Sequence, residues 1–135
     1  MMKEQILESF KALGFEMEEL EGLGYGFDYE GKHYLYMYNE DDEDYLCIAL
    51  PNVMEVEGKE DMALYQLMDK LNCTLKYVKA YKLNDGMWLF YERELFGGED
   101  LKLLLTHMIL HVEAAVNFLH KAMENVDDDK KEEED

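Results

Sequence analysis

Two histidines stand at a spacing that could support metal chemistry. His107 and His111 are at positions i and i+4 of a segment with helical periodicity, so both side chains can reach one ion from one helix face. The segment reads His-Met-Ile-Leu-His and lacks the carboxylate of the zinc-protease pattern HExxH. We interpret both as partly buried histidines beside an apolar face, and His33 and His120 as isolated. The sequence therefore predicts no metal site.

Nucleophilic side chains are scarce in this chain. Ser9 is its only serine and falls inside an expected helix, which excludes a serine nucleophile with an adjacent base. Cys47 and Cys73 are far apart and form no CxxC motif. We expect both to be buried free thiols in a reducing compartment, with a disulfide between them as the alternative.

Acidic and glycine-rich segments do not form a recognisable site either. The run Glu40–Asp44 lacks the alternating ligands, central glycine and final glutamate of a calcium loop, so we interpret it as solvated. Gly22, Gly24 and Gly26 resemble a phosphate loop only superficially, because no Lys or Ser/Thr follows at a helix start. Carboxylate pairs are uninformative in a chain with 32 acidic residues. We predict no catalytic residue and no cofactor, and hence no enzyme.

The elements that must position these residues begin with one helix and several short strands. Gly14 follows the first helical pattern, where a C-terminal capping glycine is common. Glu30-Gly31 supplies a turn between two tyrosine-rich strands, and Pro51 is expected to end the next strand. We predict, in order, a helix over 3–13, a weak strand over 15–21, a hairpin over 25–39 and a strand over 45–50.

The C-terminal half continues with a helix, a hairpin and a long helix. Asn84-Asp85-Gly86 separates two aromatic-rich runs and indicates a tight hairpin turn. We predict a helix over 59–72, strands over 75–83 and 87–95, and a helix over 99–126. Residues 127–135 are of low complexity and are expected to form a disordered acidic tail. The fold class is α+β in one domain, residues 1–126, with a mostly antiparallel sheet and the order α-βββ-α-ββ-α.

The last helix carries two apolar faces. At about 100° per residue, one face centred on Met108 has the pattern of a core contact. A second apolar set lies on the far side: Leu103, Leu110, Ala114 and Phe118. Because an ordinary surface helix has one apolar stripe, we expect this second set to be an interaction surface. Three alternatives remain for what packs against this set: a second copy of the chain, a client protein, or the rest of the domain itself.

The net charge limits the classes of partner. A formal charge of −19 disfavours nucleic acid, because phosphate binding requires a cationic surface. Anionic membrane surfaces are disfavoured for the same reason, and no apolar run is expected to reach transmembrane length. The N-terminus shows no signal-peptide core, so we expect a cytoplasmic protein.

The second half of the chain has a familiar order of features. Leu71-Asn72 closes a helix, and Lys79-Ala80-Tyr81 lies on a strand before the turn at Asp85-Gly86. A strand from Met87 to Leu95 then leads past Gly97-Gly98 into the long apolar helix. This pattern resembles the YbjN family, described as candidate sensory transduction regulators of bacteria and similar in fold to type III secretion chaperones. The resemblance covers roughly residues 59–126; before that, only the order of elements matches.

The resemblance implies a small α+β domain that binds proteins and carries no active site, and it transfers no catalytic residue. Together with the missing chemistry, it predicts a non-catalytic protein-binding, chaperone-like or regulatory module of a bacterium. We expect a homodimer with an unidentified protein partner or client. The alternative is a small-molecule sensor with a pocket between sheet and helices, lined by Tyr and Met.

Overall fold

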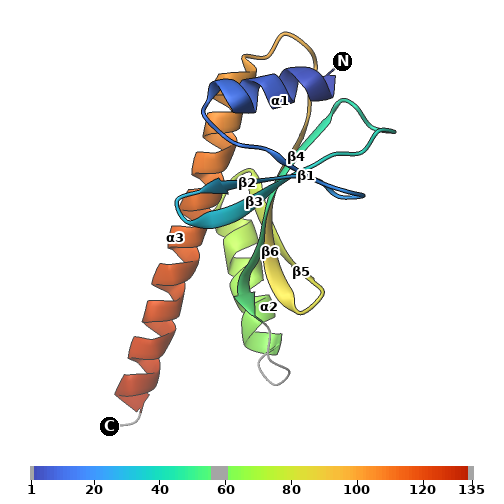
Figure 1. Cartoon of the computed structure of the whole chain (residues 1–135). Coiled ribbons are helices and arrows are strands. Elements are labelled where there is room, and N and C mark those ends of the chain that lie inside the picture. Colours follow the sequence, from blue (N-terminus) through green and yellow to red (C-terminus); the bar gives the residue numbers. More distant parts are fainter. Residues whose placement is uncertain (1, 56–60, 134–135) are drawn as a thin grey trace.

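Over the residues that the structure describes, the protein forms three helices and one six-stranded antiparallel sheet (Figure 1). The computed structural model describes residues 2–55 and 61–133. Four strands follow the first helix, and two more lie between the second and third helices. The elements are α1 Met2–Ala12, β1 Glu18–Leu20, β2 Gly24–Tyr29, β3 Lys32–Met37, β4 Tyr45–Glu55, α2 Asp61–Thr74, β5 Val78–Leu83, β6 Gly86–Glu94 and α3 Leu101–Glu133. The predicted fold class is confirmed; residues 59–60 of the predicted second helix lie outside the described residues.

A capping motif ends α1 at the predicted glycine. Gly14 has a φ of 94°, a conformation that costs little only for glycine. Its N–H donates to the carbonyl of Lys11 at 3.0 Å, and the N–H of Phe15 donates to the carbonyl of Phe10 at 3.1 Å. This pair of hydrogen bonds is the Schellman arrangement, and its usual apolar contact is present between the rings of Phe10 and Phe15. The motif fixes the direction in which the chain leaves the helix.

The sheet has the strand order β1-β2-β3-β4-β6-β5. Glu30 and Gly31, both with positive φ, form the predicted turn between β2 and β3. Alternation along β3 places Tyr34 and Tyr36 in the main core and Leu35 on the opposite face, as the sequence predicts. The other predicted hairpin is also present, with β5 and β6 paired from Val78 opposite Tyr91 to Leu83 opposite Gly86.

The prediction that Pro51 ends the fourth strand is wrong. β4 continues to Glu55, with a shift in its register against β6 between Leu50 and Met54. Proline cannot donate a ladder hydrogen bond, and an irregularity of this kind lets the strand resume beyond it. Asn52, with a φ of 52°, lies in the shifted segment.

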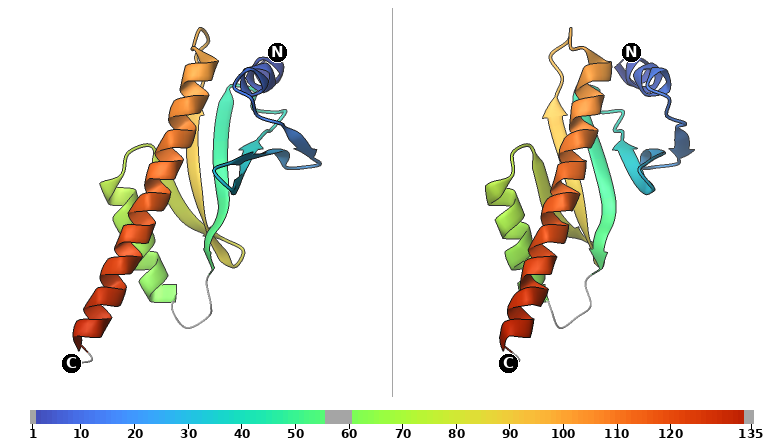
Figure 2. Two further views of the ribbon diagram at one scale, coloured as in Figure 1. Left: turned by 60° about the vertical axis from the view of Figure 1, so that its left-hand side comes forward. Right: turned by 90° about the vertical axis from the view of Figure 1, so that its left-hand side faces the viewer.

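The helices share one face of the sheet. In both views of Figure 2, α2 and α3 lie alongside β4, β6 and β5, while α1 crosses near the start of α3. The main core joins Ile6 and Phe10 of α1 and Leu71 of α2 to α3 and to the inner side chains of the sheet. The opposite sheet face carries a smaller cluster around Trp88 and Phe90.

α3 is longer than predicted. It extends to Glu133, whereas the sequence places its end near Val126 and disorder over 127–135. Extending an existing helix avoids the cost of nucleation, and Lys and Glu, which are frequent in this segment, have high helix propensity. Residues 134–135 lie outside the described part of the chain.

Asn72 on α2 covers part of the outer edge of β5. Its Nδ2 donates to the carbonyl of Ala80 at 2.9 Å, and its Oδ1 accepts from the N–H of Ala80 at 2.7 Å. The side chain thus takes the place of a neighbouring strand at the end of the sheet. We refer to this pair of hydrogen bonds as the Asn72 clasp.

We expect Asn72→Ala to lower the free energy of unfolding by about 1–2 kcal/mol, because two hydrogen bonds to a buried backbone position are lost. Urea denaturation measures the loss, and hydrogen exchange should show faster exchange at the Ala80 amide. Asn72→Asp retains the acceptor but not the donor, and should fall between the alanine variant and the wild type. An unchanged exchange rate at Ala80 in the alanine variant would contradict the clasp.

Candidate functional site

The predicted interaction surface lies on the outward side of α3. Leu103 is 56% exposed and Leu110 is 49% exposed, and Ala114 is exposed as well. Phe118 is half-buried and packs against the main core. We call these four residues the α3 outer strip. The opposite face of the helix packs inward as predicted, through Leu105, Met108, Val112, Ala115, Val116 and Leu119.

The α3 outer strip lies on a helix segment whose formal charges cancel. Between Leu101 and Glu124 the charged residues are Lys102, Glu113, Lys121 and Glu124, within a chain of net charge −19. Glu113 is turned toward the sheet, where it accepts hydrogen bonds from Tyr34 Oη and from Lys32 Nζ, the latter at 3.0 Å. Apolar association along the strip would therefore bring few carboxylates together.

The contact with Glu113 also fixes Tyr34 in its protonated form. Burial, followed by hydrogen-bond donation to Glu113, raises the pKa of Tyr34 well above its ordinary value. The phenol is therefore a permanent donor near neutral pH. It ties α3 to β3, which is a structural role and not an acid–base one.

An exposed aromatic side chain lies against α3 at His111. Tyr77 is 63% exposed, and its ring stacks on Tyr91 at a centroid distance of 5.7 Å and meets the ring of His111 at 5.2 Å. Its φ is 71°, and the N–H of Val78 donates to the carbonyl of Lys76 at 2.8 Å across it. This is a γ-turn in a sterically disfavoured conformation, of the kind that is retained at functional sites. Sequence periodicity missed it, because it assigned Tyr77 to a regular strand.

The two candidate metal ligands do not converge on a site. His111 packs against Tyr77 and Tyr91, and His107 is exposed. Within residues 2–55 and 61–133, no group of three or more His, Cys, Asp or Glu side chains is arranged to hold an ion. His33 is exposed on the β2–β3 hairpin, where it pairs with Asp28.

The possible nucleophiles are also accounted for by structural contacts. Ser9 Oγ donates to the carbonyl of Gln5 at 2.8 Å within α1. Both cysteines are free, but only Cys47 is buried; Cys73 is exposed on α2, so the prediction of two buried thiols is wrong for Cys73. Cys73 lies on the outer side of α2, away from the core stripe formed by Met68 and Leu71.

We expect the two thiols to differ sharply in reactivity. Burial raises the pKa of Cys47 to about 11, so almost no thiolate exists there at pH 8. A chromogenic disulfide reagent at pH 8 should modify Cys73 alone in the folded protein and both cysteines in urea. The Cys73→Ala variant should then show no fast reaction. Equal rates at the two sites in the native protein would contradict the burial of Cys47.

By length and composition alone, α3 from Leu101 to Glu124 could cross a membrane, although no such run was expected from the sequence. The core helix of a soluble protein meets the same criterion, and here Leu105, Met108 and Val112 form part of the core. The length and composition of α3 therefore do not distinguish a membrane-spanning helix from the core helix of a soluble protein.

Two solved structures share this arrangement of elements. YbjN from E. coli, described as a candidate transcription regulator, has a TM-score of 0.68 at 9% identity, over 89% of this chain and 92% of that one. The fold is YbjN-like. An uncharacterized protein from Methanothermobacter thermautotrophicus has a TM-score of 0.66 at 14% identity, over 93% of this chain and 98% of that one. No family model and no curated protein matches the sequence. At these identities, the YbjN-like fold is what the chains share.

Proposed function

We propose that this chain is a non-catalytic regulatory or chaperone-like module that binds another protein through the α3 outer strip. The observation that carries the proposal is the exposure of Leu103 and Leu110 on a helix whose other face is already buried in the core. Large exposed apolar side chains on one helix face are characteristic of protein contacts. Exposed Tyr77 has a disfavoured backbone conformation, and its ring contacts His111 of α3. This contact supports α3 as the binding element.

Self-association is the form of binding that the proposal favours first. The strip can pack on a copy of itself without strong charge repulsion, because the helix segment from Leu101 to Glu124 has no formal net charge. Neutral or basic proteins are the other permitted partners, whereas nucleic acid is disfavoured by the charge of −19.

Light scattering coupled to size-exclusion chromatography tests the homodimer. The wild type should have a mass above that of the 16.0 kDa monomer, and Leu110→Glu should return it to the monomer. Lys102→Gln, on the same helix, changes the net charge by the same amount without altering the strip, and should remain dimeric. A wild type that stays monomeric at high concentration would remove the homodimer from the proposal.

A client protein is tested separately by affinity capture from cell extract at low and high salt. Partners held by the α3 outer strip should be retained at high salt and lost with Leu110→Glu. Partners that are lost at high salt and are indifferent to Leu110→Glu would place binding on the acidic surface and contradict the proposed site.

The small-molecule sensor remains a second candidate. A cavity of about 440 Å³ lies between the β2–β3 turn, β4 and α3, with Leu50, Pro51, Val116 and His120 among its lining residues. Neither Tyr nor Met lines it among the described residues, unlike the pocket expected from the sequence. Thermal-shift screening against metabolites tests this candidate, because a ligand that binds the folded state raises the melting temperature.

A further inference from the structure

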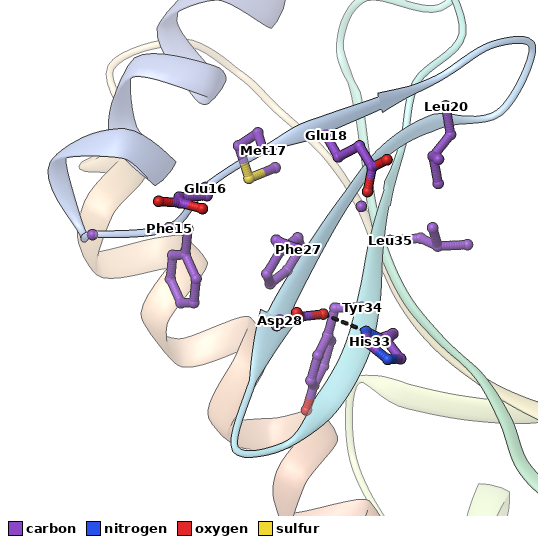
Figure 3. A pocket seen from close by; sticks show the side chains of 12 residues that line it. Phe15, Glu16, Met17, Glu18, Leu20, Phe27, Asp28, His33, Tyr34 and Leu35 are labelled. Carbon is purple, nitrogen blue, oxygen red and sulfur yellow. Dashed lines mark hydrogen bonds and ion pairs between the residues drawn. The ribbon is translucent and has the colours of Figure 1, made fainter.

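A groove of about 790 Å³ opens where β1 begins (Figure 3). One wall is the segment 14–18 that leads from α1 into β1, and the other is the β2–β3 hairpin. Figure 3 shows the two walls diverging, with the side chains of Met17 and Phe27 between them. The groove is separate from the α3 outer strip, so an inference about it does not depend on the proposed function.

The groove exposes the backbone edge of β2. β1 pairs with β2 only from Gly24 to Gly26, whereas β2 continues beside β3 to Tyr29. Within the described residues, no strand pairs with the outer edge of β2 from Phe27 to Tyr29. An unpaired edge of this kind is a template for an added strand.

The packing of Phe15 explains why the chain itself does not fill this edge. Its ring lies 5.1 Å from that of Phe27 and 6.1 Å from that of Tyr29, and it also contacts Phe10. The capping motif after α1 and these ring contacts hold the backbone of residues 15–17 outside the ladder. The gap is therefore a consequence of well-packed residues.

The two sides of the groove differ in chemistry. Phe15, Met17 and Phe27 belong to the apolar side and pack with the main core. Glu16 and Glu18 alternate with Phe15 and Met17 and are exposed, as is Asp28. An extended peptide along β2 would present alternate side chains to the apolar side and to the carboxylates.

We propose that the groove binds an extended cationic peptide segment that adds to the edge of β2. Its basic side chains face Glu16, Glu18 and Asp28, and its intervening apolar side chains lie toward Phe15 and Phe27. The net charge of −19 favours such a partner before contact. After contact, main-chain hydrogen bonds to Asp28 hold it, because Asp28 is the residue of this stretch whose N–H and C=O face away from β3.

A capped, fluorescent peptide that alternates Lys and Val is the probe, and anisotropy measures its affinity for the full chain. It should bind more tightly than an alternating Glu-Val peptide, and more tightly than an alternating Lys-Pro peptide that cannot form a ladder. Hydrogen exchange should show new protection of the Asp28 amide when the Lys-Val peptide is bound, because the amides of Phe27 and Tyr29 already face β3.

The triple variant Glu16→Gln, Glu18→Gln and Asp28→Asn should weaken binding about tenfold, since three exposed charge contacts are lost. The matched control removes three carboxylates from the 39–44 loop: Glu40→Gln, Asp42→Asn and Glu43→Gln. It should leave the affinity nearly unchanged. Equal weakening by both variants would reduce the effect to overall charge and overturn the site.

Two further outcomes would also overturn the proposal. Binding without protection of the Asp28 amide would exclude strand addition. Complete competition by spermidine, with no preference for the Lys-Val over the Lys-Pro peptide, would assign the groove to small cations. Circular dichroism of each variant separates a loss of binding from a loss of fold.

Discussion

Replacing Gly24 with alanine is expected to lower the free energy of unfolding by about 3 kcal/mol or more. Gly24 has a φ of 143°, and an added Cβ would lie 2.0 Å from the carbonyl oxygen of Tyr36 on β3. The contact is with backbone at the end of the β2–β3 ladder, where Gly24 lies opposite Met37, so no side chain can move aside to relieve it. Either β2 must shift relative to β3 or the pairing at this end must break.

Gly22→Ala is the matched control for this prediction. Gly22 also has a positive φ, 78°, but an added Cβ would meet nothing within 4 Å. Only the backbone penalty then applies, about 1–2 kcal/mol. Urea denaturation of the two variants side by side measures the difference. Equal losses would mean that β2 and β3 do not approach as closely as described.

Leu105→Ala is expected to cost about 2–5 kcal/mol, the range for deleting a fully buried leucine side chain. Leu105 is 0% exposed and belongs to the core, whereas Leu103 is 56% exposed. Leu103→Ala should therefore change the stability of the isolated chain by no more than about 0.5 kcal/mol. Denaturation at dilute protein concentration keeps association out of the comparison. A large loss for Leu103→Ala under these conditions would mean that α3 is rotated from the orientation described.

Local periodicity was sufficient to predict most of the fold. Tyr34 and Leu35 point to opposite faces because a strand alternates, and Gly14 ends α1 because only glycine adopts its conformation cheaply. The continuation of β4 beyond Pro51 was not predictable in this way. It depends on β6, which resumes pairing at Met54 after the register shift. The residues of β6 that determine this pairing are far from Pro51 in the sequence.

The candidate sites also differ in whether local sequence or contacts between distant residues determine them. A helical wheel separates Leu105 from Leu103 and Leu110, since both faces belong to one helix. Tyr77 could not be found from the sequence, because its position depends on contacts with Tyr91 and His111 from two other elements. The groove at β2 was likewise unpredictable, since it arises because β1 starts to pair with β2 only at Glu18.

The Asn72 clasp makes the two ends of the sheet differ in how readily they accept a neighbouring strand. Strand-to-strand polymers grow without limit only when both ends of a sheet accept a neighbour. Here the β5 end is engaged at Ala80 by a side chain of its own domain, while β1 is the other end of the sheet. A strand added at β1 or β2 therefore finds no matching acceptor on the next copy. Association through the sheet should therefore be disfavoured at the β5 end, which lowers the tendency of a chain rich in β-structure to form fibres.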